Sequence, residues 1–250
     1  MINNIIQLKH FFSDRKGTER TETLETLNAH VNTNADTIHF SMLWCAGNKT
    51  SINQSDKNSL QYLFRFLKEV EKAYGKKAHL TLIFADTHAY LNGYGLDSMR
   101  SYFKEIQSVC EIEKYNYSFD FSSELCKKKI VKKGFQDFTH YIDDIIKNPE
   151  SHFKQTGLPT EQVETFYQAA RKHCKRTKQD YSGIRLNEKE AAMAYFAFAN
   201  FERDVITENF FNSVFITYMT REEGGALPKL PIVRLYSIES GLRTRPWFID

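Results

Sequence analysis

Strand-like and helix-like segments alternate in the first half of the chain, and this pattern constrains the fold more than any other feature. Residues 37–44, TIHFSMLW, favour a strand and run into a small, polar loop. A helix is predicted to follow, with Ser55 as its N-cap. Residues 79–85, HLTLIFA, predict a second strand, and a second helix is expected to begin at Asp97 after a polar turn. The first helix has an apolar stripe at helical spacing, formed by Leu60, Leu63, Phe64, Leu67 and Val70.

This alternation is typical of a parallel sheet with right-handed crossovers. We therefore predict an α/β fold, with a Rossmann-like, mostly parallel sheet flanked by helices. The second half reads as mainly helical, over residues 135–148, 160–176 and 187–206. Further strands are expected within YNYSFDFSSEL and at 231–240. Because no repeat or low-complexity linker divides the sequence, residues 1–250 are predicted to form a single α/β domain.

Composition excludes several classes of protein. Of the 250 residues, 41% are hydrophobic and 26% charged, which is ordinary for a globular protein and unlike a disordered one. No window approaches the roughly 18 to 20 apolar residues of a membrane span. The first apolar stretch is too short and too polar for a signal peptide. These features predict a cytoplasmic protein without a membrane partner.

Cysteines and charge give weaker signals. The four cysteines show no C-x-x-C spacing, so neither a disulfide framework nor a zinc site is indicated. A net charge of +3 is too small to indicate a nucleic-acid binder. Basic residues concentrate in KKKIVKK (127–133) and RKHCKRTK (171–178), and we interpret both runs as solvated helix faces in preference to binding patches.

Polar side chains follow both predicted strands of the first half. Lys49 lies in the loop after the first strand, and Asp86-Thr87-His88 follows the second. Because carboxyl ends of parallel strands meet at one edge of a sheet, Lys49 and Asp86 are expected to lie on a common cleft. This edge is where ligands bind in parallel α/β sheets.

Each of these side chains allows more than one interpretation. Lys49 could bind an anion or form an imine with a carbonyl, or could be a surface lysine. Asp86 ends an apolar strand, where a carboxylate needs a partner, or it could cap the following turn. His88 is suited to general acid or base catalysis. Asp86 and His88 alone fall short of a metal signature, so no metal site is predicted.

Two residues near the end of the sequence are further candidates. Arg234 lies inside the apolar stretch PIVRLY, where a guanidinium needs a bidentate carboxylate or phosphate, or an acidic side chain of the protein itself. Trp247, in RPWF, could be a substrate platform, although a tryptophan is more often a core residue.

The order of these signals resembles that of the isocyanide (isonitrile) synthases. The stretches that carry the resemblance are KTSIN (49–53), Asp56 before SLQYLFRFL, AYGKKAHLTLIFAD (73–86), and VRLYSI (233–238) followed by RPWF (245–248). The match spans most of residues 19–110 and 230–248. The sequence has Thr-His after Asp86 where that family would have a glycine, and Phe248 where it commonly has histidine.

This resemblance implies an enzyme that condenses the amine of an amino acid with the ketone of ribulose 5-phosphate, and then fragments the adduct to leave an isonitrile carbon. It implies no cofactor. The predicted catalytic residues are Lys49, Asp86 and His88, and their roles follow from charge: Lys49, with Arg234, would hold a phosphate or carboxylate, and Asp86 and His88 would move protons. An Fe(II)/2-oxoglutarate oxygenase is expected in the same pathway, and the amino acid stays open. The substrate-binding residues implied are Thr50, Ser51, Asn53, Arg234, Ser237 and Trp247.

Two alternatives stay open. LIFADTHAYL (82–91) resembles a strand of tyrosyl-tRNA synthetases, and AGN followed by DTH is similar to the order in cyclodipeptide synthases, which use aminoacyl-tRNA. Ser51 would then be the nucleophile, displaced by two positions, and the lack of HIGH and KMSKS motifs argues against ATP-dependent activation. A non-enzymatic sensor of small anionic metabolites would keep the anion-binding residues without needing His88.

Overall fold

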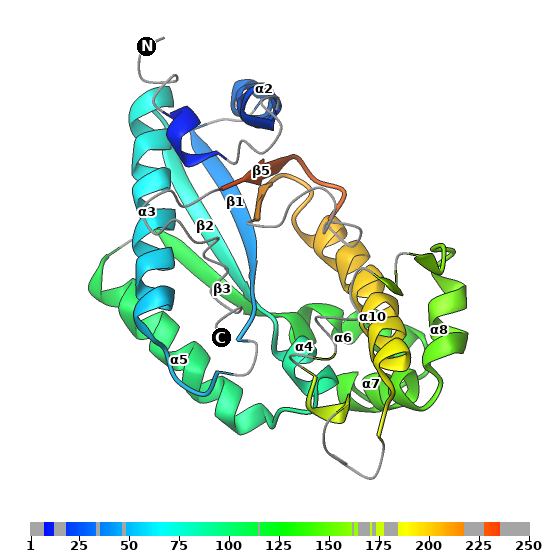
Figure 1. The fold of residues 1–250 in the computed structure, drawn as a ribbon. Helices are drawn as coiled ribbons and strands as arrows, with labels where there is room; N and C mark the ends of the chain where they lie inside the picture. The colour runs from blue at the N-terminus through cyan, green and yellow to red at the C-terminus, as the bar shows by residue number, and fades with distance from the viewer. Residues whose placement is uncertain are drawn as a thin grey trace.

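The computed structural model describes residues 8–12, 19–33, 36–46, 49–114, 116–161, 163–164, 171, 174–177, 185–217 and 228–235. Their strands form one five-stranded parallel sheet in the order β3-β2-β1-β4-β5 (Figure 1). The strands are β1 (Thr37–Trp44), β2 (Lys77–Phe84), β3 (Tyr117–Phe121), β4 (Val214–Thr217) and β5 (Ile232–Arg234).

The predicted pairing of the first two strands is confirmed. β1 and β2 run parallel in an unbroken register from Thr37 opposite Lys77 to Trp44 opposite Phe84. Together with the flanking helices, this sheet confirms the predicted α/β fold with a helical second half. The strand expected in YNYSFDFSSEL is β3, and β5 is the described part of the strand expected at 231–240. Neither β4 nor helix α2 (Glu19–Thr33) was predicted.

One face of the sheet is covered by helices α3 (Gln54–Tyr74), α5 (Leu96–Ile112) and α2. The predicted apolar stripe of α3 is buried against this face throughout. The two predicted N-caps are wrong, because α3 is capped by Asn53 and α5 by Gly95. The Asn53 side chain accepts a hydrogen bond from the backbone N–H of Asp56, and the Asp56 carboxylate accepts one from the N–H of Asn53. This capping box satisfies two backbone donors that Ser55 would leave unpaired.

The second half of the chain is a group of helices at the carboxyl end of the sheet, which we call the helical lobe (Figure 1). It consists of α6 (Ser122–Lys132), α7 (Phe138–Lys147), α8 (Pro149–Gln155) and α10 (Glu188–Asn209). Pro149 was expected only to end a helix, but it also begins α8, because proline fits the first helical turn. The helix predicted at 160–176 lies partly outside the described residues. Residues 161, 163, 164 and 171 are helical as predicted, and the end of the segment is a short 3-10 turn, η2 (Lys175–Thr177).

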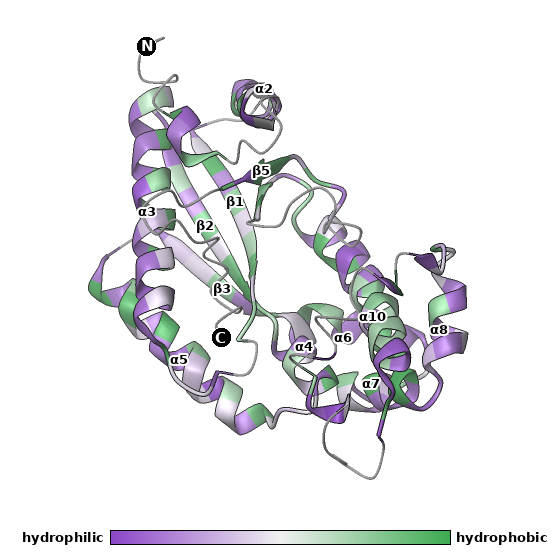
Figure 2. Ribbon diagram, in the orientation of Figure 1, coloured by the Kyte–Doolittle hydropathy of each residue, from purple (hydrophilic) through white to green (hydrophobic). Residues whose placement is uncertain are grey.

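Helix α10 joins the lobe to the sheet. Figure 2 shows it hydrophobic in its central turns and hydrophilic toward its ends. Phe198 packs in the core of the lobe with residues of α6 and α7. About two helical turns further on, Ile206 packs with Ile83 of β2 and Phe215 of β4, on the face of the sheet opposite α3. The lobe is thus packed against the sheet through a shared helix. That residues 1–250 form a single domain stays a prediction.

Candidate active site at the carboxyl edge of the sheet

The strand order places a topological switch point between β1 and β4. From β1 the chain proceeds to β2 and β3 on one side, whereas β4 and β5 lie on the other side. Ligands of parallel α/β folds bind at this position, outside the carboxyl ends of the strands. Lys49 follows β1 and Asp86 follows β2, so both lie at this edge. Arg234 is the last residue of β5, in register with Thr217 at the end of β4, and lies at the same edge.

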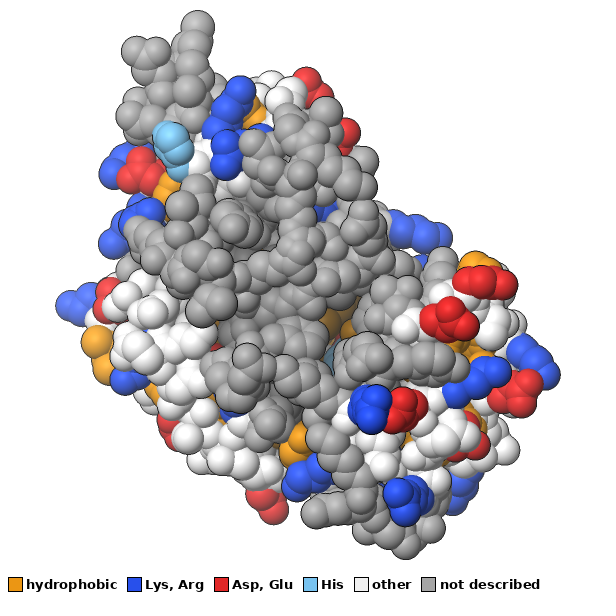
Figure 3. Space-filling model, viewed as in Figure 1, with side chains coloured by type: hydrophobic (Ala, Val, Ile, Leu, Met, Phe, Trp, Pro, Cys, Tyr) orange, Lys and Arg blue, Asp and Glu red, His pale blue; other side chains and the backbone are white. Residues whose placement is uncertain are grey.

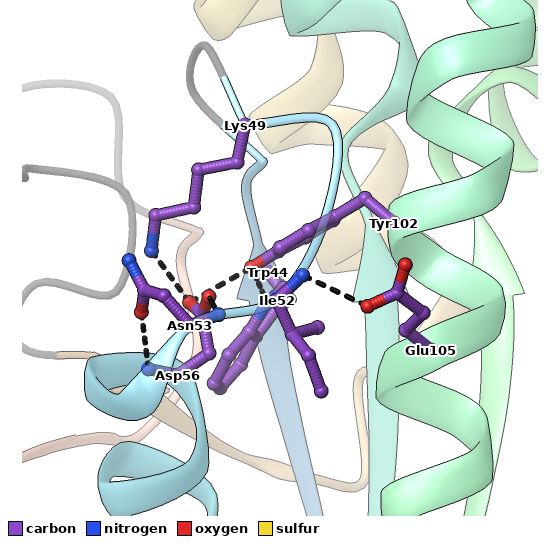
Figure 4. A network of polar contacts seen from close by, with 7 residues as sticks. All are labelled: Trp44, Lys49, Ile52, Asn53, Asp56, Tyr102 and Glu105. Atoms are coloured by element: carbon purple, nitrogen blue, oxygen red, sulfur yellow. Dashed lines mark hydrogen bonds and ion pairs between the residues drawn. The ribbon is translucent and has the colours of Figure 1, made fainter.

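Lys49 is held inward by a buried carboxylate (Figure 4). Its Nζ lies 2.6 Å from Oδ1 of Asp56, and the two side chains are 7% and 0% exposed. The hydroxyl of Tyr102 donates to the same oxygen at 3.0 Å, and the indole N–H of Trp44 donates to that hydroxyl at 2.9 Å. Burial lowers the pKa of Lys49, and Asp56 opposes this shift. The surface-lysine interpretation is therefore wrong.

The loop that carries Lys49 is fixed where it enters α3. The backbone N–H of Ile52 donates to Oε2 of Glu105 on α5 at 3.0 Å (Figure 4). Asn53 uses its side-chain oxygen to cap α3. Thr50 and Ser51 are exposed. Of the predicted substrate-binding residues, these two are thus accessible, whereas Asn53 is engaged in the fold. Ser237 and Trp247 lie outside the described residues.

Asp86, Thr87 and His88 form the first turn of a short helix, α4 (Asp86–Leu91), which was not predicted, and the expected polar turn follows it at Asn92 and Gly93. Oδ1 of Asp86 accepts hydrogen bonds from the backbone N–H groups of Thr87 and Ser123, both at 3.0 Å. Its Oδ2 accepts from the Ser123 hydroxyl at 2.5 Å. Because Ser123 lies in the first turn of α6, Asp86 ties the start of α4 to the start of α6. Burial raises the pKa of Asp86, the Ser123 hydrogen bonds oppose it, and the charge of Glu202 adds to the rise.

His88 is paired with Glu202, a residue that the sequence interpretation missed. Its Nε2 lies 2.5 Å from Oε2 of Glu202, and both side chains are nearly buried. Oε1 of Glu202 accepts hydrogen bonds from the hydroxyls of Thr87, at 3.1 Å, and Ser122. An acidic residue in the middle of the apolar segment 187–206 was the available signal, because a buried carboxylate requires partners.

The other end of α4 is held by Arg176, which is completely buried. Its guanidinium donates to the backbone oxygens of Leu91, at 2.9 Å, and Tyr90, at 3.1 Å. The carbonyl of Leu91 is one that the end of a helix leaves without a backbone donor, and the carbonyl of Tyr90 also accepts from the N–H of Gly93 at 2.9 Å. The interpretation of run 171–178 as a solvated face is therefore wrong at Arg176. In run 127–133, by contrast, Lys127 and Lys128 are exposed on α6, as expected.

Lys49 and Asp86 thus engage separate partners at one edge of the sheet, and their common cleft stays a prediction. Within the described ranges, no group of three or more His, Cys, Asp or Glu side chains is arranged to hold a metal ion. No helix of the described part is long and apolar enough to cross a membrane.

An open surface depression is lined by six residues around the start of α10: Thr177, Arg185, Leu186, Asn187, Glu188 and Glu190. Glu202 lies on the same helix about 20 Å from this depression, at a rise of 1.5 Å per residue.

Comparison with known proteins gives a match in structure only. No protein-family model matches the chain, and no curated protein matches it. Among solved structures, the crystal structure of the PvcA protein from Pseudomonas aeruginosa is similar, with a TM-score of 0.61. The match covers 98% of this chain and 87% of PvcA at 10% sequence identity. At this identity the likeness shows a shared fold that extends over nearly the whole chain.

Proposed function

We propose that this chain is an isocyanide synthase-like enzyme that joins an amino acid to ribulose 5-phosphate. The observation that carries the proposal is the fold match to PvcA over nearly the whole chain, in a sequence whose motifs resemble those of isocyanide synthases. A group of proton-transferring side chains at the carboxyl edge of the sheet supports an enzyme at this position. The identity of the amino acid is left open.

The proposed reaction begins when the substrate amine adds to the ketone carbon of the sugar phosphate, and water leaves. Asp86 and His88 supply and remove the protons of this step, because both are ionisable groups at the strand ends. The exposed Thr50 and Ser51 contact the sugar hydroxyls. Arg234 binds the phosphate or the carboxylate, for which a guanidinium offers paired donors.

Lys49 takes a narrower role than its charge alone suggested. Because Asp56 already neutralises its ammonium group, an anionic substrate must compete with a buried carboxylate for it. Burial lowers the pKa of Lys49, which favours the neutral amine that an imine requires. We therefore place Lys49 beside the ketone carbon and leave phosphate binding mainly to Arg234.

The sensor and the tRNA-dependent alternative lack a comparable supporting observation. On the face of the helical lobe that Figure 3 shows, Lys and Arg side chains of the described residues are interspersed with Asp and Glu. A tRNA-binding face would instead gather basic side chains opposite the phosphates. A sensor would not need the buried pair of His88 and Glu202.

The proposal predicts turnover without tRNA. The purified chain is incubated with the twenty amino acids and with ribulose 5-phosphate labelled with ¹³C at the ketone carbon. The product should contain the labelled carbon bonded to the amino acid's nitrogen, which mass spectrometry and ¹³C NMR detect. His88→Ala should lower the rate by roughly 10² to 10⁴-fold, the usual contribution of a positioned acid or base. His140→Ala, at an exposed histidine of α7, is the matched control.

The same assay separates the alternatives. A product formed only with aminoacyl-tRNA, with a trapped acyl-enzyme at a serine, would reject the proposal in favour of a cyclodipeptide synthase-like reaction. Saturable binding of the sugar phosphate without product from either mixture would leave the sensor.

A further inference from the structure

Glu202 is an acidic residue in an environment that disfavours charge. It lies in α10 among apolar neighbours such as Phe198 and Val205, and it is 2% exposed. A carboxylate in such a position is costly unless it is paired and hydrogen-bonded. Its presence there needs an explanation beyond the packing of α10.

Both oxygens of Glu202 are used, and they reach two other elements. Oε2 contacts Nε2 of His88 on α4, at 2.5 Å, and Oε1 accepts from Ser122 at the start of α6 and from Thr87. Burial alone would raise the pKa of Glu202, but the charge of His88 and these hydrogen bonds together outweigh it and lower the pKa. The two hydroxyls that donate to Oε1 favour the ionised carboxylate, as the lowered pKa does, and an ionised carboxylate only accepts hydrogen bonds. It follows that Nε2 of His88 carries a proton.

The ring of His88 is also restrained from its sides. Tyr195 lies 5.4 Å from it and Phe198 lies 5.5 Å away, between ring centroids. Within the described part of the chain, the hydrogen bond that His88 makes to Glu202 uses Nε2 and leaves Nδ1 without a partner. Nδ1 is nevertheless not one of the fully buried polar atoms that lack a partner, so it keeps some exposure. Nδ1 is therefore the ring nitrogen that a bound molecule can reach.

We propose that Glu202 is a positioning residue that acts through His88, holding Nε2 protonated so that Nδ1 exchanges the proton with the substrate. This inference rests on the proposed function for its catalytic part. The arrangement itself is independent of the substrate, because it follows from three contacts of one carboxylate. A purely structural ion pair would link the helices equally well but would not require that His88 hold one tautomer during turnover.

The tautomer can be measured directly by NMR on ¹⁵N-histidine-labelled protein. His88 is identified among the eight histidines by the signals that His88→Ala removes. In the wild-type protein its Nε2 should show the shift of a protonated nitrogen. In Glu202→Gln, which keeps the size but not the charge, the ring should move toward the tautomer mixture of a free imidazole. Glu208→Gln, at an exposed position of the same helix where it pairs with half-buried Lys129, is the control that should leave the His88 signals unchanged.

Turnover of the same variants tests the catalytic part. Glu202→Gln should lower kcat by up to the roughly 10² to 10⁴-fold lost in His88→Ala, with KM little changed. The double variant, His88→Ala with Glu202→Gln, should be no slower than His88→Ala alone. The effects of substituting two residues that act as one unit do not add.

Three results would overturn the inference: an unprotonated Nε2 in the wild-type protein, an unchanged tautomer in Glu202→Gln, or full kcat in that variant. If no substrate is turned over, the proposed function fails while the NMR measurement still decides the arrangement. If Glu202→Gln does not fold, the wild-type spectrum decides it alone.

Discussion

At the scale of single residues, Asp86 and Glu202 are two buried carboxylates with opposite electrostatic behaviour. Glu202 is stabilised by the charge of His88, whereas Asp86 has only hydroxyl and backbone donors as direct partners. Burial therefore raises the pKa of Asp86, while the pKa of Glu202 is lowered despite burial. The opposite shifts fit two different proposed roles, with Asp86 exchanging a proton and Glu202 staying ionised to hold His88.

The raised pKa of Asp86 predicts a specific dependence of stability on pH. An acid whose folded pKa lies above its unfolded value, 3.8, contributes stability that is fully present below 3.8 and lost as pH rises through the folded pKa. Asp86→Asn keeps an Oδ1 acceptor for the backbone N–H groups of Thr87 and Ser123, and its side chain cannot ionise. Its free energy of unfolding, relative to the wild-type protein, should therefore increase between pH 4 and pH 7. Each tenfold change in the acid dissociation constant corresponds to about 1.4 kcal/mol.

Urea unfolding at a series of pH values measures this difference. Glu202 has a lowered pKa, so its own contribution is lost in both proteins as pH falls through its folded pKa, and its charge, which raises the pKa of Asp86, is part of the measured difference. Asp97→Asn, in the exposed first turn of α5, serves as the control. A difference that decreases with pH would mean that the Asp86 carboxylate is stabilised by its site, contrary to the burial argument.

At the scale of elements, the sequence predicted what local pattern determines. The eight-residue strands β1 and β2 and the amphipathic helix α3 have strong periodicity, and Lys49, Asp86 and His88 could be singled out because they follow those strands. Helix α4 was missed because it has six residues and no side-chain N-cap. The pair of His88 and Glu202 is 114 residues apart in the chain, a separation over which a single sequence carries no pattern.

Helix α4 is too short to be stable alone, so its partners must hold it. Arg176→Met should leave the carbonyl of Leu91 without its donor at the end of the helix, whereas the carbonyl of Tyr90 keeps the backbone N–H of Gly93 at 2.9 Å. An unsatisfied buried carbonyl costs about 1 to 3 kcal/mol, and we expect the opening free energy of α4 to fall by at least one such contribution. Hydrogen exchange of the α4 amides measures it, with Lys175→Met as the neighbouring control. Unchanged α4 protection in Arg176→Met would show that the contacts at the start of the helix suffice.

At the scale of the whole molecule, the sheet and the helical lobe share both a helix and the candidate site. Helix α10 contributes Phe198 to the core of the lobe and Ile206 to the core against β2 and β4. The polar contacts of Glu202 lie between these two residues along the helix. The sequence could predict that the second half is helical, but not that its longest helix would carry a residue of the site.

This shared helix predicts that the described parts of the chain unfold in one cooperative transition. The sequence has two tryptophans, so Trp247→Phe leaves Trp44, at the end of β1, as the only tryptophan and thus a probe of the sheet. Far-UV circular dichroism reports mainly the helices, many of which lie in the lobe. The two probes should give the same urea midpoint, which is the test of a two-state transition.

Substitutions in the separate cores sharpen this test. Phe198→Ala in the lobe and Phe40→Ala in the sheet should each lower the free energy of unfolding by about 3 to 5 kcal/mol. In a single domain, both substitutions shift the fluorescence and dichroism midpoints together. If Phe198→Ala moved the dichroism transition while the Trp44 fluorescence transition stayed in place, the lobe would be a separate folding unit, and the prediction of one domain would be wrong. Coincident shifts would mean that the contacts of Glu202 with α4 and α6 form in the same step as the sheet, so that the site assembles only in the complete fold.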